Sequence, residues 1–210
     1  MTNEPGLRER KKRATRQQIS DIATGLFLER GFDGVTVADV ARAADVSTKT
    51  VFNYFPRKEG LFLDRLDTLG EMITHAVRER PADTTALRAL RDMYLSLLQE
   101  RNPVVGYARA EYADFWRVVT GSSALRARVR EAVEELEDLV ARLYAEAEGI
   151  DPDGVRARLA GAYVLAAHRT VYLTAARRIL AGEDADAVAA DGVDRYHQAF
   201  DAAERAIDAL

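Results

Sequence analysis

The stretch TVADVARAADVSTKTVFNYFPRKE, residues 36–59, predicts two short helices joined by a tight turn, with a third element beginning after Pro56. Thr36 is an N-cap for the first helix, and Asp39, three residues later, is its partner in a capping box. Asp45 tolerates the left-handed backbone that such a turn requires. The apolar residues of the first helix follow the i, i+3, i+4, i+7 spacing of one buried face, and they are Val37, Val40, Ala41 and Ala44.

The second helix of this pair begins after Ser47, a second N-cap, and Val51 and Phe55 give it an inward face. The side chains left for its outer face are Thr48, Lys49, Thr50 and Asn53. Thr and Asn hydrogen-bond base edges or phosphates and Lys supplies charge, so the pattern favours a helix-turn-helix that enters a major groove. The same spacing also suits a helical hairpin inside an ordinary α-domain, with a solvated polar face.

A wider set of residues carries a resemblance to a known family. These residues are Thr15-Arg16-Gln17, Ile22-Ala23, Leu26-Phe27, Gly31-Phe32, Thr36-Val37, Val40-Ala41, Ala44, Val46-Ser47, Thr50, Asn53-Tyr54-Phe55, Lys58-Glu59 and Leu61. The stretch that holds them, about residues 12–62, resembles the DNA-binding domain of TetR-family transcriptional regulators. The resemblance implies a homodimeric, all-α repressor or activator whose C-terminal domain binds a small molecule.

The helix spacing and the resemblance together give a set of expected DNA-binding residues, which are Arg16, Thr36, Ser47, Thr48, Lys49, Thr50, Asn53, Tyr54 and Lys58. The resemblance places a lysine that contacts the DNA backbone at Lys58. The chain departs from the family pattern at two positions. The family often has Tyr where this chain has Phe52, so a phosphate contact through that hydroxyl is lost, and it often has Gly where this chain has Asp45.

Length and composition bound the class of protein. The chain has 210 residues, of which 48% are hydrophobic and 30% charged, and this predicts a folded protein of one to two domains. It has no cysteine, no uninterrupted apolar run of the roughly 18 residues that a membrane span needs, and no signal-peptide pattern, so we expect a cytoplasmic protein. The three histidines, His75, His168 and His197, have no metal-type spacing, so we expect neither a metal nor a cofactor.

Charge is distributed unevenly along the chain. Residues 1–60 hold 11 basic and 8 acidic side chains, a net charge of +3. Because the whole chain has a net charge of −4, residues 61–210 have a net charge of −7. Six basic residues lie within residues 8–16. A basic end on an acidic body is the electrostatic pattern of a protein that sets one end on phosphate.

The expected fold class is all-α, with an N-terminal three-helix DNA-binding head that contains the helix-turn-helix and a C-terminal helical domain for ligand binding and dimerisation. We expect a flexible basic arm over residues 1–14, the DNA-binding domain over residues 15–57 and the C-terminal domain over residues 58–210. Within these, a first helix should cover residues 15–30, and a longer helix should run from about residue 58 to residue 80.

The last two helices are expected over residues 152–180 and up to the C-terminus. Their apolar repeats leave two interpretations open: the helices complete one subunit's core, or they form half of a four-helix dimer interface, as the resemblance implies. On the second interpretation the interface residues are Tyr163, Val171, Tyr196, Phe200, Ala203 and Ile207.

Large aromatic residues gather in the middle of the C-terminal domain. Most such residues are core, but the family resemblance implies a ligand cavity there, and the expected ligand-facing residues are Tyr107, Tyr112, Trp116 and His168.

The function that these patterns favour is a sequence-specific DNA-binding transcriptional regulator, and the family resemblance implies a repressor that a small-molecule ligand releases from a palindromic operator. Its partners would be double-stranded DNA, a second copy of the chain and the ligand, with no membrane. One alternative is a protein that organises DNA without sequence preference. The other is an α-helical enzyme, but the chain has no phosphate loop, no His-x-x-x-His pair and no nucleophile elbow, so we expect no enzyme.

Overall fold

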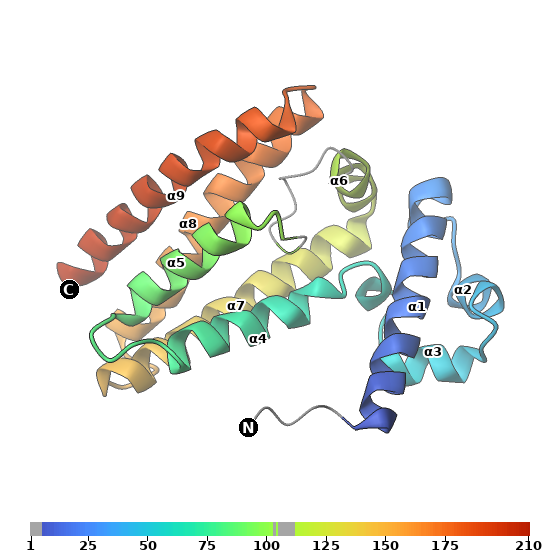
Figure 1. Cartoon of the computed structure of the whole chain (residues 1–210), viewed down its shortest axis with the longest axis horizontal. Coiled ribbons are helices and arrows are strands. Elements are labelled where there is room, and N and C mark those ends of the chain that lie inside the picture. Colours follow the sequence, from blue (N-terminus) through green and yellow to red (C-terminus); the bar gives the residue numbers. More distant parts are fainter. Residues whose placement is uncertain (1–5, 103, 105–111) are drawn as a thin grey trace. The chain divides into compact units, whose positions relative to one another are not determined.

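The computed structural model describes residues 6–102, 104 and 112–210, and all regular structure in these ranges is helical (Figure 1). This confirms the all-α fold class. The chain divides into two compact units: a head unit, residues 1–64 with 117–128, and a body unit, residues 65–116 with 129–210. Within the described ranges, no helix has both the length and the apolarity to cross a membrane.

The head unit is built from α1 (Leu7–Arg30), α2 (Val37–Ala43), α3 (Thr48–Tyr54) and the short 3₁₀ helix η1 (Lys58–Leu61), together with the junction of α6 and α7. The core of this unit centres on Phe27, whose ring centroid lies 5.0 Å from that of Phe32 and 5.6 Å from that of Phe62. The chain leaves α1 at Gly31, where φ is 74°, a backbone conformation that glycine adopts at little cost. The rings fix the loop after α1 against the helix that precedes it.

The start of α1 corrects the expected basic arm. The helix begins at Leu7, so residues 8–14, which were expected to belong to a flexible arm, are part of α1. The reason is composition: residues 7–18, LRERKKRATRQQ, contain no glycine or proline and are rich in Arg, Lys, Gln and Ala, which are good helix formers. Six basic side chains therefore lie on the first turns of a helix.

The predicted long helix over residues 58–80 is also interrupted. The 3₁₀ helix η1 is followed by a turn, and α4 covers only Arg65–Arg78. Leu61, Phe62 and Leu63 explain the break, because all three are buried, at 1%, 4% and 7% exposure. Three consecutive residues cannot share one face of a regular helix, whereas a turn lets each reach the core.

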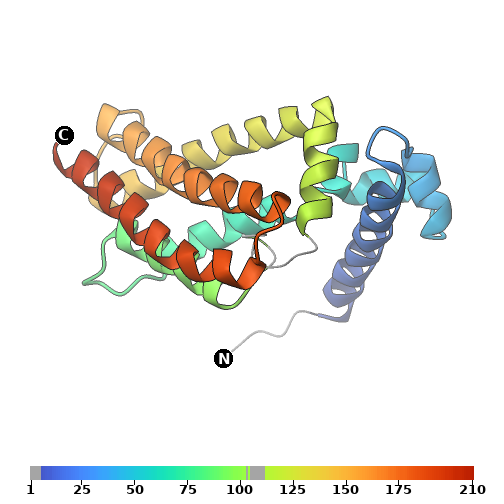
Figure 2. The same ribbon diagram turned by 90° about the horizontal axis from the view of Figure 1, so that it is seen from above.

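The body unit contains α4, α5 (Ala86–Gln99), most of α7 (Ser123–Glu148), α8 (Val155–Leu180) and α9 (Ala185–Asp208), together with the start of α6 (Tyr112–Gly121). Helices α8 and α9 lie side by side, and α5 packs against α9 and α4 (Figure 1, Figure 2). Helices α7 and α8 approach closely at Gly161, where an added Cβ would lie 2.3 Å from the carbonyl oxygen of Glu137. The absence of a side chain at Gly161 therefore sets the distance between these two helices.

Burial corrects the expected dimer residues. Val171, Tyr196, Phe200, Ala203 and Ile207 are at most 6% exposed within the single chain, and only Tyr163 is half-buried. The side chains of Tyr196 and Phe200 pack against Tyr94 of α5, with ring centroids 5.8 Å away in each case. Of the two interpretations of the repeat, burial therefore supports the one in which this stripe completes the protomer's own core.

Candidate nucleic-acid interface

Helix α2 begins with the predicted capping box. The backbone amide of Asp39 donates to Thr36 Oγ1 at 3.1 Å, and the backbone amide of Thr36 donates to Asp39 Oδ2 at 2.9 Å. The hydroxyl of Thr36 also donates to the same carboxylate, and these hydrogen bonds hold the pKa of Asp39 below its usual value. The side chain of Thr36 thus caps the N-terminus of α2.

The turn between α2 and α3 has the geometry that the sequence predicts. Asp45 has φ of 55°, the left-handed conformation expected of it. Ser47 then caps α3, since Ser47 Oγ accepts from the backbone amide of Thr50 at 3.0 Å, and the two hydroxyls of Ser47 and Thr50 lie 2.8 Å apart. In the protein without DNA, the hydroxyls of Ser47 and Thr50 therefore both take part in hydrogen bonds at the start of α3.

The outer face of α3 gathers three of the predicted DNA-binding residues. Val51 and Phe55 are 0% and 2% exposed and fix the inward face. Thr48, Lys49 and Asn53 are exposed, and Lys49 and Asn53 lie opposite the inward side chains. This arrangement presents a hydroxyl, an ammonium and a carboxamide together to solvent, which are the groups that bind phosphates and base edges.

Two predicted residues lie at the margin of this face. The guanidinium of Arg16 lies over the ring of Phe55, 4.6 Å from its centroid, so Arg16 packs against the residue that directly follows α3. Tyr54 is half-buried next to Phe55 in sequence. The Arg16 side chain therefore helps to hold the end of α3 in place.

Lys58 has a structural contact that the sequence did not reveal. Its ammonium donates to the carbonyl oxygen of Phe32 at 2.6 Å and lies 4.1 Å from the ring centroid of Phe32 and 5.7 Å from that of Phe27. Burial lowers the pKa of Lys58, while the nearby charge of Asp33 acts in the opposite direction. In the protein alone, the ammonium ties η1 to the loop after α1.

A buried aromatic cluster in the body unit joins two of the predicted ligand residues. Trp116 and His168 are each 9% exposed, and Tyr172 lies between them, with ring centroids 5.4 Å and 5.5 Å away. The Nδ1 atom of His168 lies 2.9 Å from the hydroxyl of Tyr196, and burial lowers the pKa of His168 to about 4, so the imidazole is neutral at pH 7. Tyr107 lies outside the described residues, and Tyr112 is the first residue of α6.

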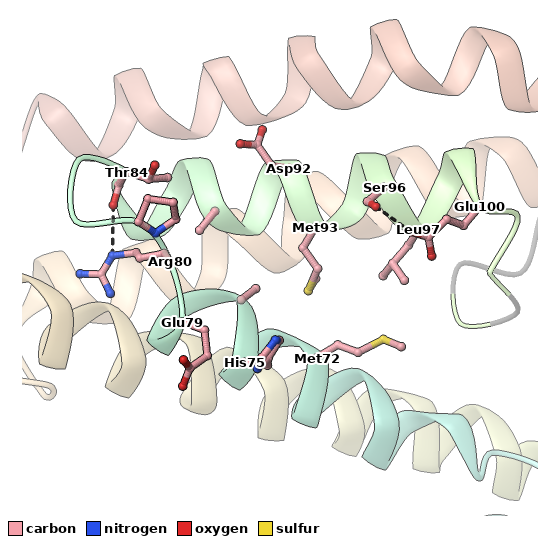
Figure 3. Close-up of a pocket in the computed structure, with 13 residues that line it drawn as sticks. Met72, His75, Glu79, Arg80, Thr84, Asp92, Met93, Ser96, Leu97 and Glu100 are labelled. Atoms are coloured by element: carbon pink, nitrogen blue, oxygen red, sulfur yellow. Dashed lines mark hydrogen bonds between the residues drawn. The ribbon is translucent and has the colours of Figure 1, made fainter. Parts of the chain in front are cut away.

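A cleft of about 470 Å³ lies between α4 and α5 (Figure 3). Met72 of α4 and Met93 and Leu97 of α5 give it an apolar lining, and none of these residues was singled out as a ligand contact from the sequence. One end of the cleft holds Arg80, whose guanidinium donates to the carbonyl oxygens of Val77 and Thr84 at 2.6 Å and 3.1 Å. The surface of the cleft is thus largely apolar, and at one end two hydrogen bonds hold the Arg80 side chain in position.

Comparison with known proteins assigns the family. Residues 19–64 match the model of the bacterial regulatory proteins of the tetR family. The chain is 33% identical over 153 residues to the HTH-type transcriptional regulator TcmR of Streptomyces glaucescens, a match that covers 72% of this chain and 68% of TcmR. It is also 41% identical over 64 residues to the HTH-type transcriptional regulator LuxR of Vibrio harveyi, covering 30% of this chain and 28% of LuxR.

A solved structure shares the fold over most of the chain. It is the crystal structure of NalD, the secondary repressor of the MexAB-OprM multidrug efflux pump in Pseudomonas aeruginosa, with a TM-score of 0.52 and 22% identity over 90% of this chain and 97% of NalD. The head unit with its capped helix pair, the family model that matches it and the relative that extends into the body unit all agree. The chain belongs to the TetR family of bacterial regulatory proteins.

Proposed function

We propose that the protein is a transcriptional regulator that recognises a specific double-stranded DNA sequence through α3. The observation that carries this proposal is the outer face of α3, where Thr48, Lys49 and Asn53 are exposed together on a rigidly capped helix. Asn can bind adenine through two hydrogen bonds, and Lys can bind guanine or phosphate. The basic first turns of α1 supply further charge in the same unit.

The test is selection of genomic DNA fragments by the purified protein at near-physiological salt, read by sequencing. The proposal predicts enrichment of one palindromic sequence. A triple variant with Thr48→Ala, Lys49→Ala and Asn53→Ala is the matched control, because its side chains are exposed and the fold should persist. Binding without enrichment would support the alternative of a protein that organises DNA without sequence preference.

A palindromic operator implies two copies of the chain, and we propose that they meet through the outward side of α8. Leu159, Ala162, Ala166 and Leu173 follow a helical repeat there and are half-buried within the single chain. Leu180 continues the stripe and is 43% exposed. This surface replaces the buried stripe that the sequence suggested.

The mass of the protein in solution tests this surface. The double variant Leu159→Glu and Leu173→Glu should halve the mass while leaving the helical content unchanged, because two charges would be buried at the interface. Leu28→Glu, on the exposed side of α1, should leave the mass of a dimer unchanged. Phe200→Glu should instead unfold the body unit, because Phe200 is 1% exposed. A dimer that persists in the double variant would refute the surface.

We further propose that the protein is a repressor and that a small molecule bound in the body unit releases it from DNA. The cleft between α4 and α5 supports this, because its volume of about 470 Å³ lies within the range of sites for drug-sized ligands and its lining is mostly apolar. Helices α6 and α7 each contribute residues to both units, so a change in the body can reach the head along continuous helices. Ligand would act by favouring a conformation that binds DNA weakly.

A neutral apolar fluorophore, N-phenyl-1-naphthylamine, can probe the cleft before the natural ligand is known. Saturable binding to the wild type should weaken in Met93→Trp, which fills the cleft, and persist in Gln99→Trp, on the exposed side of the same helix. Equal binding to all three proteins would place the ligand elsewhere in the body.

A further inference from the structure

Helix α3 carries a large apolar side chain at the edge of its outer face. The ring of Phe52 is 46% exposed, whereas the other phenylalanine rings of the head unit's described residues, those of Phe27, Phe32, Phe55 and Phe62, are at most 4% exposed. A single exposed apolar residue is common on protein surfaces, but here it lies among the polar residues of a binding face. The position of the ring relative to the polar residues therefore decides whether bound DNA would cover it.

Helical geometry places Phe52 at the edge of the outer face, between the inward side chain of Phe55 and the outer side chain of Lys49. Successive residues of an α-helix are separated by about 100° around the axis. Measured from Thr48, Phe52 lies at about 40°, Lys49 at about 100° and Asn53 at about 140°. The ring thus lies between Thr48 and Lys49, so a DNA surface that contacts these two residues also covers Phe52.

The chemistry of the ring restricts what it can recognise. Phenylalanine has no hydrogen-bond donor or acceptor, so it cannot bind a phosphate oxygen or the polar edge of a base. In the major groove, the apolar group that distinguishes one base pair from the others is the C5-methyl group of thymine. Burying the exposed ring against this methyl group would remove apolar surface of both partners from water.

We propose that Phe52 is a specificity-determining residue whose ring packs against the C5-methyl group of a thymine in each half of the operator. The inference rests on the proposed function, because it requires that α3 enters the major groove. It adds a base preference that hydrogen bonding alone does not supply. The polar neighbours Lys49 and Asn53 set the position of the helix, and Phe52 discriminates thymine from cytosine and from the purines at one base pair.

Replacement of thymine by deoxyuridine in the selected operator tests the inference, because it removes only the methyl group and keeps every donor and acceptor. Binding is measured by fluorescence anisotropy with one symmetric pair of thymines replaced at a time. At one pair, wild-type affinity should fall about fourfold for one substituted half-site and about 15-fold for both, the effect of one buried methyl group in each.

Three variants make the measurement specific to the ring. Phe52→Ala should bind the thymine and deoxyuridine operators with equal affinity, and Phe52→Tyr, which keeps the ring, should retain the preference for thymine. Leu28→Ala removes a side chain of similar exposure, 44%, from α1 and should behave as the wild type. Equal helical content and thermal unfolding of all four proteins would verify that the fold is unchanged.

Either of two results would overturn the inference: a wild type indifferent to deoxyuridine at every thymine, or a Phe52→Ala variant that keeps the full preference. A loss of affinity in Phe52→Ala that is equal for both operators would indicate contact with the sugar instead, and would also overturn it. Failure to select any operator sequence would contradict the proposed function and not the role of Phe52.

Discussion

The hydroxyl of Ser122 donates a hydrogen bond to the carboxylate of Asp33, with 3.1 Å between Oγ and Oδ1. Ser122 lies between α6 and α7 and is 2% exposed, while Asp33 lies in the loop after α1. On either side of Ser122, Val119 and Leu125 are also buried, at 2% and 0% exposure. The α6–α7 junction is therefore anchored in the head unit, on the same loop that Lys58 contacts at Phe32.

Removal of this hydrogen bond should loosen the junction. We expect Ser122→Ala to lower the free energy of unfolding by about 1–2 kcal/mol, because it removes the bond to Asp33 and also the acceptor of the Leu125 backbone amide at the start of α7. Urea denaturation followed by circular dichroism measures the change. Ser123→Ala, one residue further along and exposed, is the control and should stay within about 0.5 kcal/mol of the wild type. Equal stability of the two variants would mean that the contact contributes nothing.

Lys49 and Lys58 should respond differently to salt. Lys49→Ala should reduce the slope of log affinity against log salt by about one for each half-site, because a phosphate contact is lost. Lys58→Met keeps the apolar stem but loses the bond to Phe32, so it should cost about 1–2 kcal/mol of stability and leave the slope unchanged. A reduced slope in Lys58→Met, with unchanged stability, would show instead that Lys58 contacts a DNA phosphate.

The close approach of α7 and α8 predicts a cost for any side chain at Gly161. Gly161→Ala should destabilise the body unit by about 1–3 kcal/mol, because the new methyl group would meet the backbone at Glu137. Gly25→Ala is the opposite case, since nothing lies within 4 Å of its added Cβ in the middle of α1, and it should stabilise by roughly 0.5–1 kcal/mol. Thermal denaturation of both variants would show shifts of opposite sign, and a neutral Gly161→Ala would contradict the packing.

His168 predicts how stability depends on pH. Its pKa is about 4 in the folded protein because of burial and near 6.5 in the unfolded chain, so the unfolded chain binds the proton first on acidification. The contribution is complete above pH 6.5 and is lost as pH falls toward 4, up to about 3 kcal/mol. Unfolding measured from pH 7 to pH 4.5 should show a steeper loss for the wild type than for His168→Gln. His197→Gln, at an exposed position, should follow the wild type.

Features that depend on neighbours in sequence were predicted correctly. Thr36 and Ser47 cap their helices, and Asp45 takes the left-handed conformation, because each of these outcomes is decided within four residues. The buried stripe of α9 was also visible as a repeat in the sequence. A repeat indicates that a face is buried but not whether the same chain or a partner covers it, so the sequence leaves both interpretations open for Tyr196 and Phe200, and burial within the single chain distinguishes them.

Contacts between distant segments could not be predicted. Lys58 binds the carbonyl oxygen of Phe32, 26 positions away, and Ser122 binds Asp33, 89 positions away. No local pattern marks either pair, because a lysine near a helix start and a serine in a turn both have ordinary surface roles. Phe52 does carry a signal in the sequence, since it lies one turn after Thr48, whereas the resemblance to the family points only to the hydroxyl that Phe52 lacks.

The central claim is that α3 reads a DNA sequence, and a comparison of two duplexes tests it most directly. The affinity of the protein for its selected palindrome is measured against that for a shuffled duplex of equal length and composition, at one salt concentration. We predict a ratio of at least about 10³ for the wild type, and a much smaller ratio for the triple variant of Thr48, Lys49 and Asn53. Equal affinity of the wild type for the two duplexes would contradict the claim.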